Sequence, residues 1–203
     1  MEAHAEPLLE RDVDPDPLRQ FRRWFGEAGE AVRMPEAAAV ATATRDGSPS
    51  ARMVLVKRFD ERGFVFHTNY GSRKSDELEA NPRAALLYYW DPLGRQVRIE
   101  GPVERIARAE TAEYFRTRPR GAQIGAHASR QSRPIGSREE LEAREAEVAR
   151  VFADGEVPVP ESWGGYRLVP ETYEFWQHRD DRLHDRLRYR RDAGGWTIER
   201  LQP

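Results

Sequence analysis

The fold of this chain is constrained most by a series of short strand-like segments that follow one another with only turns between them. Residues 37–44, 50–59 and 64–69 have the pattern of strands, and the turn sequences Arg45-Asp-Gly-Ser48 and Asp60-Glu-Arg-Gly63 separate them. No helical pattern intervenes, so the first half of the chain predicts an antiparallel meander and not alternating strand–helix–strand units. The sequence also has no GxGxxG motif, which argues against a doubly wound nucleotide-binding sheet.

The second half of the chain adds strands and a few helices. Asp192-Ala-Gly-Gly195 has the composition of a hairpin turn, and further strands are predicted over residues 84–90, 96–105, 165–169, 173–176, 185–191 and 197–201. Helices are predicted from Asp14-Pro-Asp-Pro17 onward and over residues 72–80, 109–117 and 137–153, and residues 118–136 are predicted to form a loop. We therefore expect a mainly β fold with helices, a split β-barrel of about six to eight antiparallel strands decorated by about four helices.

The length of 203 residues fits one domain. We expect residues 1–16 to form a short flexible N-terminal arm and residues 17–203 to form the domain. The N-terminus is acidic and has no apolar segment, which predicts neither a secretory signal nor a transit peptide. The chain also lacks the roughly 18 consecutive apolar residues that a membrane helix needs. A cytoplasmic location without a membrane partner is therefore expected.

The chain contains no cysteine, which excludes disulfides, thiolate nucleophiles and cysteine-ligated metal clusters. Its five histidines show no HExxH-like spacing, so no metal site is expected. Redox chemistry in such a chain would require an organic cofactor.

Lysine is rare: of the 33 basic residues only Lys57 and Lys74 are lysines. A compact ammonium suits point-charge contact with a phosphate, whereas a guanidinium makes planar paired contacts. The two lysines are therefore candidates for phosphate binding, and their survival by chance is the alternative.

Residues 50–59 place candidate side chains on both faces of one strand. Alternation puts Arg52 on one face and Lys57 on the other, in the company of Met53, Leu55 and Phe59. A cation among apolar side chains is costly unless it is paired, so this pattern indicates a negative partner for Lys57. The alternative is a lysine at a strand end that extends into water.

Two helical segments carry further candidate anion-binding groups. Arg73 and Lys74 lie in the first turn of the helix predicted over residues 72–80, where the helix dipole disfavours cations unless an anion is also present. Tyr114 and Arg118 are four residues apart on one predicted helix face, a spacing that lets a hydroxyl and a guanidinium bind one phosphate. A basic surface helix and a stacked surface pair are the respective alternatives.

The polar loop predicted over residues 118–136 and the segment Arg182-Leu-His-Asp-Arg186 are the remaining candidates. So long a loop inside a compact domain is typical of an anion or partner site. Alternation places Arg182, His184 and Arg186 on one side, which gives a positive array with one titratable imidazole. A solvent-exposed strand face is the alternative.

Taken together, these segments resemble the pyridoxamine/pyridoxine 5′-phosphate oxidase family over nearly the whole chain, from about Asp16 to the C-terminus. The most specific matches are Arg52-Met-Val-Leu-Val-Lys57, Thr68-Asn-Tyr-Gly-Ser-Arg-Lys74, Arg118-Pro-Arg followed by Gln123-Ile-Gly-Ala126, Arg130-Gln-Ser132, Glu174-Phe-Trp-Gln177 and Arg182-Leu-His-Asp-Arg186. The resemblance implies an FMN-binding split barrel that dimerises, with each flavin in a cleft between the subunits.

The resemblance also implies a role for each matched residue. The FMN phosphate and ribityl chain would be held by Arg52, Arg73, Lys74, Gln131 and Ser132. The rest of the flavin would be surrounded by the backbone of Met53, Val54, Leu55 and Val56 and by His67, Thr68, Gln96, Trp176 and Arg186. The substrate phosphate would be bound by Tyr114, Arg118 and Lys57, and Lys57 would also adjoin the cofactor. The catalytic residues Arg182 and His184, with Leu183 between them, would cover the pyridine ring of the substrate and its reacting carbon.

The activity that the resemblance implies is that of a pyridoxal 5′-phosphate synthase. This flavin-dependent oxidoreductase would oxidise pyridoxamine 5′-phosphate or pyridoxine 5′-phosphate by hydride transfer from C4′ to flavin N5, and O2 would reoxidise the flavin to give H2O2. A phenazine-pathway flavin oxidase and a non-catalytic flavin or pyridoxal-phosphate carrier on the same fold are alternatives. A nucleic-acid-binding barrel is a third, which the 35 acidic against 33 basic residues disfavour.

The chain departs from the family pattern at three positions near the predicted cleft. Ala122 stands where many members have a serine that bonds the substrate phosphate, so one neutral hydrogen bond worth about 0.5–1.5 kcal/mol is missing. His67 replaces a frequent tyrosine, and His127 replaces a frequent tryptophan. The N-terminal arm also has no counterpart of the segment that closes over the substrate in some members.

Overall fold

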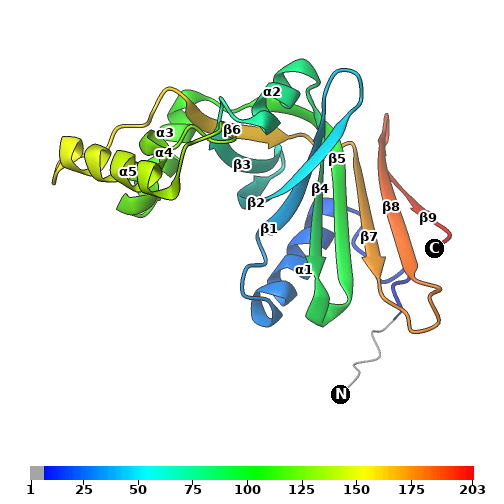
Figure 1. Cartoon of the computed structure of the whole chain (residues 1–203). Helices are drawn as coiled ribbons and strands as arrows, with labels where there is room; N and C mark the ends of the chain where they lie inside the picture. The colour runs from blue at the N-terminus through cyan, green and yellow to red at the C-terminus, as the bar shows by residue number, and fades with distance from the viewer. Residues whose placement is uncertain (1–6) are drawn as a thin grey trace.

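The computed structural model describes residues 7–203 (Figure 1). Their nine strands form one antiparallel sheet. Six strands close into a barrel in the order β1-β2-β3-β6-β5-β4, because β4 pairs with both β5 and β1. The other three strands extend the sheet beyond β5. The strands are β1 (Ala37–Ala43), β2 (Pro49–Asp60), β3 (Gly63–Asn69), β4 (Arg83–Trp90), β5 (Arg95–Arg105), β6 (Trp163–Leu168), β7 (Thr172–Gln177), β8 (Asp185–Asp192) and β9 (Gly195–Arg200).

Strand β5 belongs to both parts of the sheet and gives the barrel its split form. Its residues 95–100 pair with β7, whereas its residues 103–105 pair with β6. Gly101 lies where the partner changes, and a Cβ atom there would lie 2.0 Å from the carbonyl oxygen of Val169. A glycine is therefore required for this close approach of two backbones.

Helix α1 (Pro17–Ala31) packs its apolar face against the barrel and completes the main core. Asp16 caps the helix, since its carboxylate accepts a hydrogen bond from the backbone N–H of Leu18 at 2.9 Å. Phe21 is fully buried and meets the rings of Phe59 and Phe64 edge-on, at centroid distances of 5.0 and 4.9 Å.

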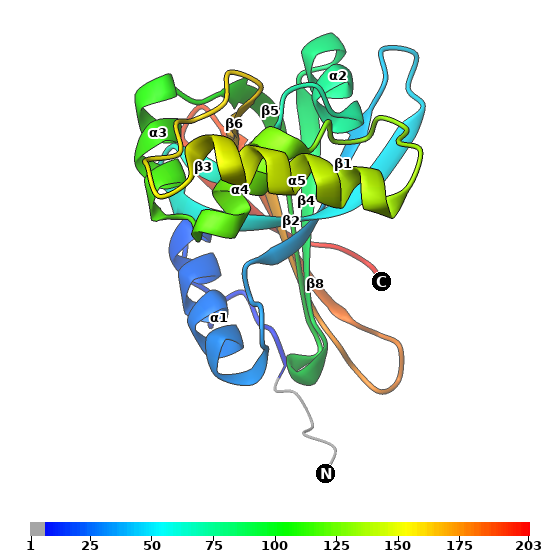
Figure 2. The same cartoon turned by 60° about the vertical axis from the view of Figure 1, so that its left-hand side comes forward.

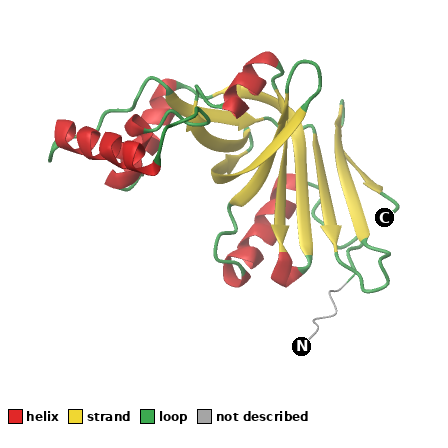
Figure 3. Cartoon of the chain, viewed as in Figure 1, coloured by secondary structure: helices red, strands yellow, loops and turns green. Residues whose placement is uncertain are grey.

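The other α-helices lie at the end of the folded molecule that is opposite α1 (Figures 2 and 3). A second apolar cluster there contains Phe115, Ile124, Val157 and Trp163. The short helix η1 (Asp91–Leu93) joins β4 to β5. None of the helices within residues 7–203 has the length and apolarity needed to cross a bilayer. The helices at this end are α2 (Arg73–Ala80), α3 (Arg108–Thr117), α4 (Arg120–Ala128) and α5 (Arg138–Phe152).

The predicted split barrel is confirmed, and each predicted strand is present within two residues of its predicted ends. The described residues hold nine strands, one for each strand segment predicted and one more than the expected total of about six to eight, and five α-helices, one more than expected, because α4 forms where a loop was predicted. Glycine lowers helix propensity, and α4 contains Gly121 and Gly125. The helix forms because Ile124 packs beside Phe115 in the second cluster, a tertiary contact that overrides propensity.

Much of the predicted N-terminal arm packs against the domain. Residues 1–6 lie outside the described residues, but Leu8 and Val13 are buried in the main core. The backbone N–H of Leu8 donates to Asp185 at 3.1 Å, and Arg200 donates twice to Glu10 at 2.8 Å. The predicted boundary after residue 16 is therefore not marked by a change in packing.

Replacing Phe21 with alanine is expected to lower the free energy of unfolding by about 3–5 kcal/mol, because it leaves a cavity in the centre of the core. Urea unfolding followed by circular dichroism measures this change. Val151→Ala on α5 is the control, since Val151 is 73% exposed and its truncation is expected to cost less than about 0.5 kcal/mol. Similar losses in the two variants would contradict the central place of Phe21.

Candidate active site

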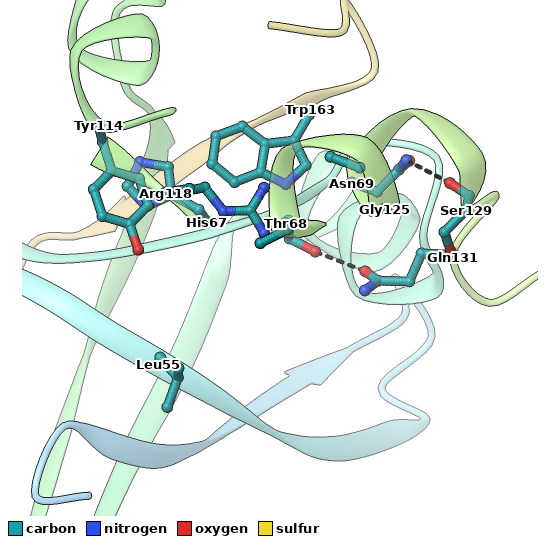
Figure 4. A pocket seen from close by; sticks show the side chains of 12 residues that line it. Leu55, His67, Thr68, Asn69, Tyr114, Arg118, Gly125, Ser129, Gln131 and Trp163 are labelled. Carbon is teal, nitrogen blue, oxygen red and sulfur yellow. Dashed lines mark hydrogen bonds between the residues drawn. The ribbon is translucent and has the colours of Figure 1, made fainter. Parts of the chain in front are cut away.

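A cavity of about 380 Å³ opens between the barrel and helices α3 and α4 (Figure 4). Strands β2, β3 and β6 also contribute to it, so the cavity depends on segments that are far apart in the sequence. Its lining residues are Leu55, His67, Thr68, Asn69, Tyr114, Arg118, Ala122, Gly125, Ala126, Ser129, Gln131 and Trp163. Six of the residues predicted from the sequence are therefore brought together: Leu55, His67, Thr68, Tyr114, Arg118 and Gln131.

Lys74, in the first turn of α2, is a buried cation next to this cavity and is only 7% exposed. Its Nζ donates to Gln131 Oε1 at 2.7 Å, to Thr68 Oγ1 at 2.9 Å and to Ser72 Oγ at 3.3 Å, and all three acceptors are neutral. Burial, followed by the charge of Arg52, lowers the pKa of Lys74 to about 8. A buried ammonium that has only neutral acceptors favours the binding of an anion.

Glu77 holds two more cations beside Lys74. Its buried carboxylate accepts hydrogen bonds from two hydroxyl groups and contacts Arg73 Nε at 2.8 Å and Arg52 Nη2 at 3.4 Å. Burial alone would raise the pKa of Glu77, but these hydrogen bonds and the charge of Arg52 lower it to about 2. Arg52, Arg73 and Lys74 contribute +3 and Glu77 contributes −1, so the cluster carries +2, which matches a phosphate dianion.

Another part of the lining carries Tyr114 and Arg118. Tyr114 belongs to α3 and Arg118 is the C-cap residue directly after its last turn, and both side chains line the cavity, as their spacing predicted. The Arg118 guanidinium lies 4.6 Å from the centroid of the Trp163 ring. Its Nη1 is buried and has no hydrogen-bond partner among residues 7–203. A buried guanidinium nitrogen without a partner favours an anionic ligand here.

His67 stacks on Tyr114, with ring centroids 4.1 Å apart. Both of its ring nitrogens are buried and lack hydrogen-bond partners within the described chain. Burial, followed by the charges of Arg118 and Arg58, lowers the pKa of His67 to about 4. The imidazole is therefore neutral near pH 7 and adds no charge to that of Arg118.

Lys57 lies outside the cavity lining and is exposed, which corrects the prediction of a cation held among apolar side chains. A β-bulge beside it interrupts the alternation of β2, so Phe59 packs against the main core while Lys57 faces outward. The Lys57 ammonium contacts Glu36 Oε1 at 2.5 Å, and this hydrogen bond lowers the pKa of Glu36. The substrate contact of Lys57 stays a prediction.

The backbone of β2 offers a free edge beside the cavity. It pairs with β1 from Pro49 to Leu55, but it pairs with β3 only from Val56 onward. The second edge of residues 49–55 therefore has no strand partner among the residues that the structure describes. Met53 and Leu55 point outward and are 64% and 44% exposed. This edge is compatible with the predicted flavin contacts of the backbone of Met53, Val54, Leu55 and Val56.

Gln131 and Ser132 follow α4. Gln131 accepts hydrogen bonds from both Thr68 and Lys74 and so links the cavity lining to the buried cation. Ser132 is exposed, has a left-handed backbone with φ 68° and is not in the lining. Of the positions that depart from the family pattern, Ala122 and His67 line the cavity, whereas His127 bonds the carbonyl of Pro158 at 2.7 Å.

Three other predicted residues form one row on the outer face of β5, β7 and β8. Gln96 lies opposite Trp176, and Trp176 lies opposite Arg186. The neighbouring positions Val97, Phe175 and Leu187 point into the core, which fixes this row on the outside. None of the three residues lines the cavity of its own chain.

Arg182, Leu183 and His184 lie in the loop between β7 and β8. This loop is at the end of the molecule that is farther from α3 and α4 (Figures 1 and 2). Arg182 has φ 64°, so the predicted strand alternation does not extend through it. His184 lies against the Trp176 ring at 4.6 Å. One chain therefore does not bring Arg182 and His184 to the cavity that holds Arg118.

Sequence reasoning missed several residues of this site, among them Glu77, Asn69 and Trp163. Glu77 lies four residues after Arg73 on α2, and this spacing is a signal that would have revealed the pair. Asn69 accepts the backbone N–H of Gly71 at 2.8 Å and shapes the turn before α2, and Trp163 supplies the ring under Arg118. No local pattern marks Trp163 as a site residue, because its contact with Arg118 joins distant segments.

Two family models match this chain. The model described as pyridoxamine 5′-phosphate oxidase matches residues 26–152, and that of the pyridoxine 5′-phosphate oxidase C-terminal dimerisation region matches residues 163–203. The chain belongs to the pyridoxamine 5′-phosphate oxidase family.

Curated relatives and solved structures agree with this assignment. A pyridoxine/pyridoxamine 5′-phosphate oxidase of Rubrobacter xylanophilus is 61% identical over 97% of this chain and 91% of its own length. One from Bordetella pertussis is 55% identical over 97% of this chain and 93% of its own length. The structure of PhzG from Burkholderia lata, in complex with tetrahydrophenazine-1-carboxylic acid, has a TM-score of 0.92 and 36% identity over 99% of this chain and 100% of that one.

A more distant structure supports the fold alone. A pyridoxamine 5′-phosphate oxidase-related, FMN-binding protein of Nostoc punctiforme has a TM-score of 0.74 at 17% identity, over 92% of this chain and 98% of that one. The family, the split-barrel fold and the oxidoreductase class predicted from the sequence are therefore confirmed.

The residues at the cavity fit a flavin mononucleotide. The cluster around Lys74 has the charge that its phosphate needs. The free edge of β2 offers backbone donors and acceptors to a planar ring with polar edges. The unpaired Nη1 of Arg118 leaves a second anion position in the same cavity.

Proposed function

We propose that this chain is a homodimeric FMN-dependent oxidase that converts pyridoxamine 5′-phosphate or pyridoxine 5′-phosphate to pyridoxal 5′-phosphate, with O2 as electron acceptor and H2O2 as second product. The observation that carries the proposal is the presence of two separate cationic positions at one cavity: the cluster of Arg52, Arg73 and Lys74 beside it, and Arg118 in its lining. A phosphorylated flavin that oxidises a phosphorylated substrate needs two such anion positions. The names of relatives at 61% and 55% identity support the same reaction.

Under this proposal the two phosphates occupy different positions. Arg52, Arg73 and Lys74, with Gln131 and Ser132 after α4, hold the phosphate end of the flavin. Tyr114 and Arg118 bind the phosphate of the substrate. The Lys57 ammonium now contacts Glu36 at 2.5 Å. The incoming substrate phosphate competes with Glu36 for this ammonium, and Lys57 then binds the phosphate together with Tyr114 and Arg118.

The chain's own contribution to the reaction is binding, orientation and exclusion of water. The FMN, when bound, supplies the two-electron chemistry by accepting a hydride from the C4′ carbon of the substrate. The neutral His67 ring and Trp163 form an aromatic wall that places Tyr114 and Arg118 beside the ligand. Arg182 and His184 cover the pyridine ring and hold its reacting carbon in position.

The dimer is part of this proposal, because Arg182 and His184 lie far from the cavity of their own chain. The C-terminal region that carries them, residues 163–203, matches the family's dimerisation region. In the proposed dimer the loop of one protomer covers the cavity of the other, and two-fold symmetry makes this contact reciprocal, so that both cavities are completed in the same way. A cytoplasmic location stays a prediction.

A phenazine-pathway flavin oxidase is the second candidate, and the structural similarity to PhzG favours it. The 36% identity to PhzG is well below the 61% identity to a pyridoxine/pyridoxamine 5′-phosphate oxidase, so we rank it second. A non-catalytic flavin carrier on this fold is the third candidate.

Purified protein reconstituted with FMN is expected to form pyridoxal 5′-phosphate and H2O2 when pyridoxamine 5′-phosphate or pyridoxine 5′-phosphate is added in air. Aldehyde absorbance and a peroxide assay measure the two products. Unphosphorylated pyridoxine is the control and is expected to react poorly, because the Arg118 position then stays unfilled. Bound FMN that no phosphorylated vitamer reduces would overturn the proposal in favour of the carrier, and oxidation of a reduced phenazine carboxylic acid alone would favour the second candidate.

The affinity for FMN is expected to fall as the pH rises above about 8. Lys74 has a pKa of about 8 in the free protein, and a bound phosphate dianion raises this pKa. Binding above that pH therefore takes up a proton, and the dissociation constant rises by at most about tenfold per pH unit. Flavin fluorescence titrations from about pH 7 to about pH 9.5 measure the slope.

Riboflavin, which lacks the phosphate, is the matched ligand, and its dissociation constant is expected to stay level over the same range. The Lys74→Met variant is expected to bind FMN more weakly at neutral pH and to lose the slope. An unchanged slope in this variant would show that another group titrates.

Two inactive variants are expected to complement each other if each site combines two protomers. Arg118→Met removes a cavity residue and Arg182→Met removes a loop residue, so each homodimer is expected to lose most of its activity. In a mixed population half of the dimers are heterodimers, each with one intact site, and co-expression is expected to restore about a quarter of wild-type activity. The rate of pyridoxal 5′-phosphate formation by the co-purified mixture measures this.

The control mixes Arg118→Met with Lys74→Met, two changes at the cavity of the same chain. No heterodimer of these variants contains an intact site, so no recovery is expected. Recovery in the control, or none in the first mixture, would contradict a site shared between protomers.

A further inference from the structure

The outer face of β5, β7 and β8 carries a set of contacts that the proposed function leaves unexplained. Gln96, Trp176 and Arg186 form one row across the three strands, and the next row along them is Arg98, Glu174 and Arg188. A carboxylate on the outer face of a sheet is normally solvated, but Glu174 is only 4% exposed. The contacts of Glu174 with its neighbours must therefore account for its burial.

Glu174 is buried because two arginines cover it. Its Oε1 accepts a hydrogen bond from Arg186 Nε at 2.8 Å, and its Oε2 accepts one from Arg98 Nη2 at 2.5 Å. Arg188, which lies directly opposite Glu174, turns instead to Glu199 on β9 at 2.7 Å. Glu174 is thus the partner of Arg186 on the diagonal and not of the arginine opposite it.

The end of the chain supplies a second contact to the same arginine. Arg186 Nη1 donates to the backbone carbonyl of Gln202 at 2.9 Å, and the backbone N–H of Leu201 donates to the carbonyl of Arg186 at 2.9 Å. Two of the three guanidinium nitrogens of Arg186 are therefore fixed by the protein. Its Nη2 has no hydrogen-bond partner within residues 7–203.

We propose that Glu174 and the Gln202 carbonyl are positioning groups that hold the Arg186 guanidinium in one orientation and leave Nη2 to contact the isoalloxazine ring of the flavin. This inference rests on the proposed function and extends it to residues for which the family resemblance implied no role. A guanidinium that is fixed before binding loses less conformational freedom when the ligand arrives, so the contact strengthens binding more than a mobile arginine would.

Loss of the Glu174 charge should release Arg186 and weaken its contact with the ring. A cation held beside the ring stabilises the reduced flavin, which carries more negative charge, and so raises the midpoint potential. The Glu174→Gln variant is therefore expected to bind flavin about tenfold more weakly and to have a lower midpoint potential than wild type. The phosphate cluster is untouched, so FMN and riboflavin should lose affinity by the same factor.

The test measures dissociation constants for FMN and riboflavin by fluorescence quenching and the midpoint potential of the bound flavin against reference dyes. Glu199→Gln is the matched control, because it removes the carboxylate that pairs with Arg188 on the same face and does not touch Arg186. Deletion of residues 202–203 tests the carbonyl without changing Glu174, and deletion of Pro203 alone is its control.

The proposal is supported if Glu174→Gln and the two-residue deletion each weaken both flavins equally and lower the potential, while both controls match wild type. It is overturned if Glu174→Gln has the affinity and the potential of Glu199→Gln. It is also overturned if only FMN loses affinity, which would place the effect at the phosphate. Wild-type protein that binds no flavin would instead refute the proposed function itself, so the two failures are distinguishable.

Discussion

The pairing of β5 with both β6 and β7 fixes the positions of the closed barrel and of the open part of the sheet relative to each other. One end of the strand pairs with β6 and closes the barrel, and the other end pairs with β7 and starts the open part of the sheet. The crossing needs Gly101, because no side chain fits against the carbonyl of Val169. The closed part carries the cavity with Lys74 and Arg118, and the open part carries Arg186 and the loop of Arg182 and His184. The two groups of residues on which the proposed function depends therefore lie at two ends of one sheet.

Burial of charge is the second constraint, and the protein handles it differently at each place. At Lys74 the ammonium is buried against neutral acceptors, so its hydrogen bonds offset only part of the desolvation cost, and a bound anion would offset more of it. At Arg186 the compensating carboxylate is built in and is itself buried. The first arrangement suits recognition of a phosphate, and the second suits a rigid contact that stays in place with or without ligand.

The sequence predicted the strands well because most of them have one face on the core, so the alternation of apolar residues follows the structure. The burial of β4 alternates in this way along nearly its whole length. The rarity of lysine and the place of Lys74 in a helix first turn marked it as a candidate for phosphate binding, and the structure buries its ammonium beside the cavity among neutral acceptors. Lys57 was harder, because a β-bulge shifts the register at that point and local alternation cannot reveal a bulge. The separation of His184 from Arg118 was beyond local reasoning, since strand order and not sequence spacing sets it.

Both ends of the described chain are attached to β8 and β9. Leu8 and Glu10 bond Asp185 and Arg200, and Gln202 bonds Arg186, which is two residues from His184. A bulky group attached next to Leu8 or Gln202 would therefore lie close to the strand that follows the loop of His184. The exposed turn after α5, where Ala153 has φ 41° and Gly155 follows, lies among the helices at the opposite end of the molecule and is the better place for a label.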